Sequence, residues 1–304
     1  MKRVVSVSLG SSKRDHTVTV DILGETFEIS RRGTDGDFNQ ALQLLKELDG
    51  KVDAIGLGGI DVYLYVKKKR YAIVDGLRLM GAVACTPVVD GSGLKNTLER
   101  EAVRYLTRET EYLRAGTKVL LVSAVDRFGM AEALAEIGCE LVCGDLIFAA
   151  GIPYPIRTLE ELEEIAAKLL PEMAKLPIDM LYPVGKKQET QDIEKAKKFA
   201  PYYNEAQVIA GDFHLIRRFL PDRLSGQLIL TNTITRDDVN LLKERGAGCL
   251  VTTTPEYEGR SFGTNVIEAA LVTLIGKAWE EITPEDYMEL LARINYRPRI
   301  TPLN

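Results

Sequence analysis

The residues whose types and spacing could do chemistry gather in a turn near the middle of the chain. They combine a hydroxyl, two charges and a glycine: Ser123, Asp126, Arg127 and Gly129. In a dinucleotide-binding unit such a turn places a pyrophosphate at a helix N-terminus, where unpaired N–H groups favour an anion. Asp145 follows the next apolar run, where a carboxylate can accept a hydrogen bond from a ribose hydroxyl. Thr252, at a later strand end, would add a hydroxyl to the same predicted cofactor site.

The turn departs from the Gly-x-Gly-x-x-Gly pattern that lets a backbone approach a pyrophosphate. Ser123 and Val125 stand where the first two glycines would be, and only Gly129 keeps the helix-packing position. Two interpretations therefore stay open, a nucleotide site and a Rossmann-like unit that binds nothing. If a nicotinamide cofactor binds, Asp145 favours NAD over NADP, because a carboxylate repels a 2′-phosphate.

The elements around this turn predict a parallel sheet. Val119–Val122 is short and uninterrupted in its apolar character, as expected of a strand buried on both faces. Met130–Ile137 repeats at helical spacing and ends before a glycine. Further short apolar runs alternate with helical patterns: Leu141–Cys143, Val208–Ala210, Leu228–Leu230 and Leu250–Thr252. Five strands alternating with helices are the signature of a Rossmann-like, doubly wound parallel sheet.

The first part of the chain predicts a separate α/β domain. Arg3–Leu9 has the pattern of a strand, and Thr17–Ile22 and Thr26–Ile29 alternate like the two strands of a hairpin. We place the boundary so that an N-terminal substrate domain covers 1–112. A Rossmann-like nucleotide domain with C-terminal helices then covers 113–304.

Composition excludes several classes of protein. The 304 residues carry a net charge of −5 without a basic stripe, so we expect no nucleic-acid partner. No apolar run approaches membrane-spanning length and the N-terminus has no apolar signal core, which predicts a cytoplasmic protein without a membrane partner. The four cysteines lie in or beside apolar strands, so we expect no metal. A homo-oligomer stays open.

Hydroxyl groups are concentrated at the end of the first predicted strand. They alternate along the strand and continue, with a cation, into the turn after it: Ser6, Ser8, Ser11, Ser12 and Lys13. This combination suits a polyhydroxy carboxylate, which needs several hydrogen bonds and one charged partner. An ordinary polar turn has the same composition, and that interpretation also stays open.

The stretch between Leu79 and Leu98 has a more specific pattern. It contains Gly81-Ala82-Val83 and then Asp90-Gly91-Ser92-Gly93-Leu94, followed by one helix, a short loop and the strand beginning at Lys118. This order resembles the shikimate and quinate dehydrogenases, including bacterial proteins of the quinate 5-dehydrogenase type. The resemblance implies hydride transfer between a nicotinamide cofactor and a cyclic polyhydroxy carboxylate.

The resemblance also implies roles for single residues. Asp90 would share the proton transfer with a lysine, and Lys67 or Lys68 would substitute for the family's own lysine motif, which is absent. The serine-rich segment would be the substrate loop, and Asn265 falls near the family's last functional helix. The sequence itself offers a second role for Asp90, as a helix cap followed by Gly91.

Two functions from different classes follow. The first, which we favour at this stage, is an NAD-dependent oxidoreductase acting on a quinate-like or shikimate-like substrate. The second is a non-catalytic two-domain protein that binds a small molecule and has kept the architecture without hydride transfer. Methyl transfer would also suit Asp145, but the Gly-rich loop that it needs is missing. A fold alone does not decide between these functions.

Overall fold

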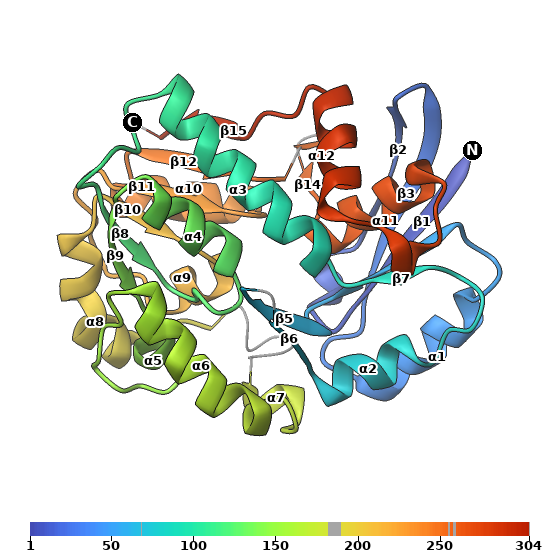
Figure 1. Ribbon diagram of the computed structural model, residues 1–304, viewed down its shortest axis with the longest axis horizontal. Helices are drawn as coiled ribbons and strands as arrows, with labels where there is room; N and C mark the ends of the chain where they lie inside the picture. Colours follow the sequence, from blue (N-terminus) through green and yellow to red (C-terminus); the bar gives the residue numbers. More distant parts are fainter. Residues whose placement is uncertain (68, 182–189, 255, 258–259, 304) are drawn as a thin grey trace.

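The computed structural model describes residues 1–67, 69–181, 190–254, 256–257 and 260–303. Figure 1 shows two α/β halves, each built on its own sheet, with helix α3 (Ser92–Glu109) running from one half to the other. The first sheet has the order β2-β3-β1-β4-β7, and the second has the order β15-β12-β11-β10-β8-β9. The predicted α/β class with mainly parallel sheets is confirmed.

The first sheet has a different helix on each face. Its strands are β1 (Lys2–Ser8), β2 (His16–Ile22), β3 (Glu25–Gly33), β4 (Ala54–Gly58) and β7 (Val88–Val89), and only β2 runs antiparallel to its neighbour. Because side chains alternate along a strand, Val5 and Val7 pack on α1 (Phe38–Leu48). Val4 faces the other way, toward α11 (Thr264–Ile275).

The second sheet contains the five strands expected from the apolar runs. They are β8 (Lys118–Leu121), β9 (Glu140–Cys143), β10 (Val208–Ala210), β11 (Leu228–Thr231) and β12 (Cys249–Thr252), all parallel, with β15 (Arg299–Pro302) antiparallel at the edge. Strand β8 lies between β9 and β10, so the strands that follow it in the chain are added first on one side of it and then on the other. Such a switch point opens a crevice at the carboxyl ends of the strands.

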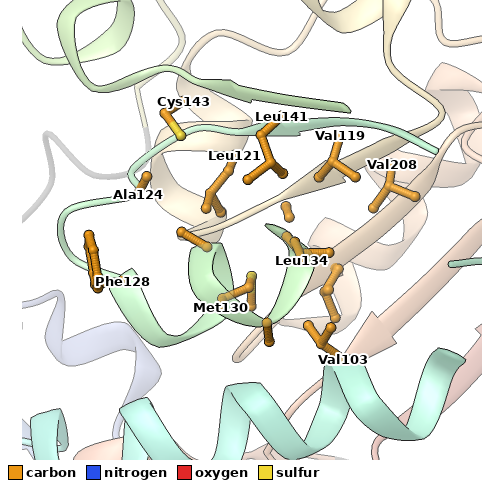
Figure 2. Close-up of a cluster of buried hydrophobic side chains, with 14 of the residues drawn as sticks. Val103, Val119, Leu121, Ala124, Phe128, Met130, Leu134, Leu141, Cys143 and Val208 are labelled. Atoms are coloured by element: carbon orange, nitrogen blue, oxygen red, sulfur yellow. The ribbon is translucent and has the colours of Figure 1, made fainter. Parts of the chain in front are cut away.

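Helix α4 (Phe128–Glu136) covers one face of the second sheet and also packs on α3. Figure 2 shows the resulting core, in which Met130 and Leu134 of α4 lie between sheet residues such as Leu121 and Val103 of α3. At Gly129 a Cβ would collide with Asn96 of α3. Gly129 therefore allows the two helices to approach each other closely, as its helix-packing position suggested.

The end of the chain returns to the first sheet. Eight residues of α11 are buried, and this helix packs with α12 (Pro284–Arg293) in the core that contains Val4. The halves are thus joined through α3, through the segment before α11 and through the segment between α12 and β15 (Figure 1). The division into 1–112 and 113–304 stays a prediction, although α11 and α12 lie in the second range and cover the first sheet.

The remaining elements surround these two sheets. They are η1 (Ser12–Arg14), β5 (Tyr63–Val66), β6 (Lys69–Ala72), α2 (Val74–Met80), α5 (Asp145–Phe148), α6 (Leu159–Met173), α7 (Ile178–Leu181), α8 (Ile193–Glu205), α9 (Phe213–Arg218), α10 (Arg236–Arg245), β13 (Glu256–Tyr257), β14 (Arg260–Ser261) and η3 (Trp279–Glu281). Among the described residues, no helix combines the length and apolar character needed to cross a membrane.

Candidate functional site

A cleft of about 1720 Å³ lies between the two halves. Residues at or just past the carboxyl ends of strands in both sheets line it. On the side of the first sheet these residues are Ser6, Ser8, Arg14, Arg31, Gly58, Thr264 and Asn265, which we call the first wall. On the side of the second sheet they are Ser123, Asp126, Arg127, Asp145, Asp212 and His214, which we call the second wall. This is where open α/β sheets bind ligands.

The two serines of the first wall point to the face of the sheet that α11 covers, because they alternate with Val5 and Val7. Asn265 of α11 donates a hydrogen bond from Nδ2 to Ser6 Oγ at 2.8 Å. Ser8 Oγ accepts from Arg31 Nη2 at 2.9 Å and from the backbone N–H of Gly10 at 3.0 Å. Both hydroxyls are buried, and both use their oxygen as an acceptor.

Glycines in β4 let the N-terminus of α11 approach the sheet. A Cβ at Gly56 would lie 2.7 Å from the carbonyl oxygen of Asn265, and one at Gly58 would lie 3.0 Å from Ser8 Oγ. A larger residue at position 56 would push the helix away, and one at position 58 would crowd the side chain of Ser8. The segment Gly56–Gly59, which stands roughly where the dehydrogenases carry their lysine motif, is therefore a packing surface.

The first wall carries more positive than negative charge. Arg31 Nη1 donates to Asp15 Oδ1 at 2.7 Å and to the carbonyl oxygen of Ser11 at 2.9 Å. Burial, with the nearby positive charge of Arg14, lowers the pKa of Arg31 to about 10. The Nη1 atom of Arg14 lies 3.0 Å from Nε2 of His214, so this arginine also joins the two walls.

On the second wall, Asp145 closes the turn that was expected to hold a pyrophosphate. Its carboxylate accepts hydrogen bonds from the backbone N–H groups of Ala124 at 3.0 Å and Val125 at 2.9 Å. Burial raises the pKa of Asp145 to about 6 despite these bonds. The predicted contact with a ribose hydroxyl would need oxygens that the protein's own backbone already uses.

Arg127 and Lys95 are the centres of a buried charge network. The side chain of Arg127 is 1% exposed and pairs with Glu99 of α3, which is equally buried. Arg127 also lies 3.4 Å from Asp212, and Lys95 pairs with Asp126 and, at 2.9 Å, with Asp61 of the first half. These pairs tie both halves to α3, so Arg127 is not free to pair with a phosphate.

The pKa values of Asp61 and Asp126, the two carboxyls that pair with Lys95, are shifted in opposite directions. Burial, reinforced by the charge of Asp126, raises the pKa of Asp61 to about 7. Burial would also raise the pKa of Asp126, but Lys95 and Arg127 outweigh it and lower that pKa to about 2. Of these two carboxyls, Asp126 on the second wall therefore carries most of the negative charge.

Asp90 is buried and lines the cleft, but its oxygens are fully engaged. Oδ2 accepts from the backbone N–H groups of Val62 at 2.6 Å and Tyr63 at 3.0 Å. Oδ1 accepts from Ser92 N at 2.9 Å and Ser92 Oγ at 2.6 Å. Asp90 thus holds the start of α3 against β5, which agrees with the capping interpretation and adds a clamp that the sequence did not indicate.

Lys67, one of the two lysines proposed as partners of Asp90, pairs with another residue. Lys67 lies at the tip of the β5–β6 hairpin, where Nζ pairs with Glu163 of α6 at 2.6 Å. Lys68 lies outside the described residues. No lysine shares a described hydrogen bond or ion pair with Asp90, so the structure does not assemble the expected proton-transfer pair.

The other predicted residues divide between the cleft and local structure. Lys13 lines the cleft and is exposed, whereas Ser11 caps η1 and Ser12 bonds to Asp35. Thr252 is buried in β12 and is not among the described residues that line the cleft. Across the described ranges, no group of three or more His, Cys, Asp or Glu side chains could hold a metal ion.

Sequence reasoning missed two arginines of the first wall, Arg14 and Arg31. Arg31 was missed because the predicted strand stopped at Ile29, two residues short of it, whereas β3 continues to Gly33. Thr264, at the start of the apolar helix, and His214, just past the strand Val208–Ala210, stand where the sequence itself suggests ligand contacts. Nothing in the local sequence indicated that Arg14 and His214 would meet.

Comparison with known families places the chain. A family model described as a domain of unknown function, DUF8754, matches residues 93–303, and another, DUF8753, matches residues 3–90. The chain belongs to the DUF8754 family. The two models meet between Asp90 and Gly93, where α3 begins. The sequence matches no curated protein.

Several solved structures of binding proteins are similar to the chain over most of its length. A glucose-galactose binding protein from Geobacillus stearothermophilus is 10% identical, with 99% of this chain and 97% of that chain covered and a TM-score of 0.39. A periplasmic solute binding protein from Actinobacillus succinogenes with bound D-allose is 10% identical, covering 100% and 98%, with a TM-score of 0.34. A fatty acid ABC transporter substrate-binding protein from Thermomonospora curvata is 12% identical, covering 95% and 80%, with a TM-score of 0.40.

These findings correct the expected identity and activity. The chain matches families of unknown function and is similar to substrate-binding proteins of transporters, so its description as a shikimate or quinate dehydrogenase, and as an NAD-dependent oxidoreductase, is wrong. In the site, the oxygens of Asp90 are bound by Val62, Tyr63 and Ser92, no lysine among the described residues pairs with it, and Asp145 bonds to the N–H groups of the nucleotide turn. At TM-scores of 0.40 and below, these likenesses assign no ligand to the chain. The binding of NAD, the cytoplasmic location and a homo-oligomer stay predictions.

Proposed function

We propose that this protein binds a small polar molecule in the cleft between its two halves and does not transform it. The observation that carries the proposal is the cleft itself, which both sheets line with the residues at their carboxyl ends. Ligand sites of α/β proteins occur at this position because loops from several strands converge there.

The state of the titratable groups supports binding rather than catalysis. Asp90 is saturated with hydrogen bonds, Arg127 is paired with the buried carboxylate of Glu99, and Lys95 is paired with the half-buried carboxylate of Asp126. A general acid or base must be able to exchange a proton with a substrate within hydrogen-bonding distance. Groups that hold the fold together in this way are poor candidates for that role.

The dimensions of the cleft favour closure around the ligand. Small-molecule sites commonly measure about 300–1,000 Å³, and this cleft is larger, at about 1720 Å³. Helix α3 and the segment between α12 and β15 are positioned to act as hinges, because a few residues at the ends of elements suffice for domain closure. The contact between Arg14 and His214 marks an edge where the walls already meet.

A thermal-shift screen tests the proposal. A panel of sugars, polyols, sugar acids and sugar phosphates should contain at least one compound that raises the melting temperature, since a ligand that binds only the folded state must stabilise it. NAD, NADP and S-adenosylmethionine belong in the same panel. Nuclear magnetic resonance should then show the bound compound chemically unchanged after prolonged incubation. Its conversion to a product, or stabilisation by the nucleotides alone, would overturn the proposal.

A further inference from the structure

The N-terminus of α11 presents unused hydrogen-bond donors to the cleft. Gly263 is the N-cap residue and has no side chain to cap the helix. Within the described ranges, the backbone N–H groups of Thr264 and Asn265 have no acceptor. Such groups carry the positive end of the helix dipole and favour an anion.

The hydroxyl of Thr264 provides an independent indication of a ligand. The residue is only 6% exposed, it lines the cleft, and no hydrogen-bond partner for Oγ1 exists in the described part of the chain. Buried polar groups are nearly always paired, so an unpaired one facing a cleft requires an explanation. A ligand atom that accepts a hydrogen bond from Oγ1 would supply one.

The serines beside Thr264 are also available as donors. Ser6 Oγ already accepts from Asn265, and Ser8 Oγ already accepts from Arg31 and Gly10. Each hydroxyl therefore still has its hydrogen to donate. This part of the first wall thus offers several donors and few acceptors.

The charged side chains that line the first wall are positive, which is the sign that an anion requires. Lys13, Arg14 and Arg31 line this part of the cleft, and Asp15 pairs with Arg31. Two buried acids lie near the helix: Asp90, which lines the cleft, and Glu268, which is not among the described residues that line it. Asp90 binds the N–H groups described above, and Glu268 accepts from Leu94 N at 3.1 Å and from Tyr287 at 2.6 Å. An oxyanion would find positive charge and donors together.

We propose that the first wall is an oxyanion site that binds the carboxylate or phosphate group of a polyhydroxylated ligand at the N-terminus of α11. Thr264 Oγ1 and the backbone N–H group of Thr264 donate to the anion, and Arg14 and Arg31 supply the charge. This inference rests on the proposed function and narrows its ligand to an anionic polyol.

Three compounds of similar size separate the alternatives. D-gluconate carries a carboxylate, D-glucose 6-phosphate carries a phosphate and D-glucose is neutral, so calorimetric titration at constant ionic strength reads the contribution of each group. We expect gluconate or glucose 6-phosphate to bind at least tenfold more tightly than glucose, because charge-assisted hydrogen bonds are the stronger ones. The tighter of the two identifies the anion.

Substitutions in α11 then locate the site. Thr264→Val removes the hydroxyl at nearly constant shape and should weaken binding of the anionic probe about tenfold, whereas Thr264→Ser should restore it. Unliganded Thr264→Val should be at least as stable as the wild type, because it removes an unpaired buried hydroxyl. Thr273→Val is the matched control, since Thr273 lies on the same helix and donates to Ala270 within it.

A second test removes charge instead of a hydroxyl. Arg14→Gln should weaken binding of the anionic probe severalfold more than binding of glucose, while Arg104→Gln, which affects a pair on the surface of α3, should change neither.

The outcomes distinguish this inference from the function on which it rests. Equal affinity for glucose and the two anions would overturn the oxyanion site and leave the binding function standing. Unchanged anion binding in Thr264→Val would place the anion elsewhere and also overturn the inference. No binding of any of the three would overturn it as well, and the wider panel would then decide the fate of the binding function.

Discussion

The two walls of the cleft contain similar kinds of residue but use them in different ways. On the second wall, Asp145 binds backbone N–H groups of its own turn, and Arg127 is buried against Glu99. On the first wall, Thr264 Oγ1 has no partner in the described part of the chain, and the N-terminus of α11 is uncapped by any side chain. Most polar groups of the second wall have hydrogen-bond partners within the protein, whereas donors of the first wall lack acceptors.

The difference shows why charge and position alone do not identify a binding residue. Asp145 and Arg127 stand where a dinucleotide fold would place functional groups, yet both hold the protein together. The informative quantity is the balance of donors and acceptors, because a buried group without a partner is costly unless a ligand or water supplies one. Ser123 Oγ and Arg127 Nε are exceptions on the second wall, since both atoms are buried and lack a hydrogen-bond partner among the described residues.

The largest effect should come from breaking the second wall at Arg127. We expect Arg127→Met to lower the free energy of unfolding by about 3–5 kcal/mol, because Glu99 would be left buried and uncompensated. Urea denaturation at pH 8 measures this. The double variant Arg127→Met, Glu99→Met should recover most of the loss. A loss below about 1 kcal/mol would mean that the buried pair does not organise this wall.

Asp90 tests whether a cleft residue acts as a clamp or only as a cap. We expect Asp90→Asn to lower the free energy of unfolding by about 1–3 kcal/mol. The amide group of asparagine would place an N–H donor opposite N–H groups from which the carboxylate now accepts hydrogen bonds. Thermal or urea unfolding measures the loss. Asp37→Asn is the control, since Asp37 only caps α1 and asparagine caps a helix equally well. Equal, small effects of the two changes would reduce Asp90 to a cap.

Glu268, beneath the first wall, should make stability depend on pH. Burial, with the charge of Asp90, raises its pKa from 4.5 to about 7. The folded state then binds more protons than the unfolded state between those values, so the contribution of Glu268 to stability falls as the pH rises through this window. Glu268→Gln keeps an acceptor but cannot ionise. It should match the wild type near pH 4.5 and exceed it at pH 8 by about 1–3 kcal/mol; parallel pH profiles would contradict this.

The smallest effect on stability should come from the contact between the walls. Burial is the main cause of a lowered pKa at His214; Asp212 opposes the shift and Arg14 adds to it. Neutral His214 can accept from Arg14, whereas protonated His214 would repel it. His214→Leu should change the free energy of unfolding by less than about 1 kcal/mol.

Small-angle scattering measures the structural consequence of that contact. The radius of gyration of the unliganded wild type should increase as the pH falls and His214 becomes protonated. His214→Leu should be open at every pH. A wild-type radius that does not change with pH would show that this contact does not hold the walls together.

Local pattern was enough to predict most of the elements. The alternation in β1 and β2, the apolar runs of the second sheet and the Asp-Gly-Ser-Gly start of α3 each reflect short-range physics: side-chain periodicity, burial on both faces and capping. The role of Gly129 in helix packing could be predicted for the same reason. The extent of β3 could not, because it ends in Arg31, Arg32 and Gly33, which do not continue the apolar alternation of the strand.

What the sequence by itself determined is the set of strands and helices and their grouping into parallel sheets. Only the tertiary structure decided the site, because its residues are distant in the chain. Asn265 and Ser6 are 259 residues apart and meet because α11 returns to the first sheet. Likewise, the partners that occupy Asp145, Asp90 and Arg127 are set by how the turns and helices pack. Whether a polar group bonds within the fold or stays available to a ligand depends on these long-range contacts, which local spacing does not encode.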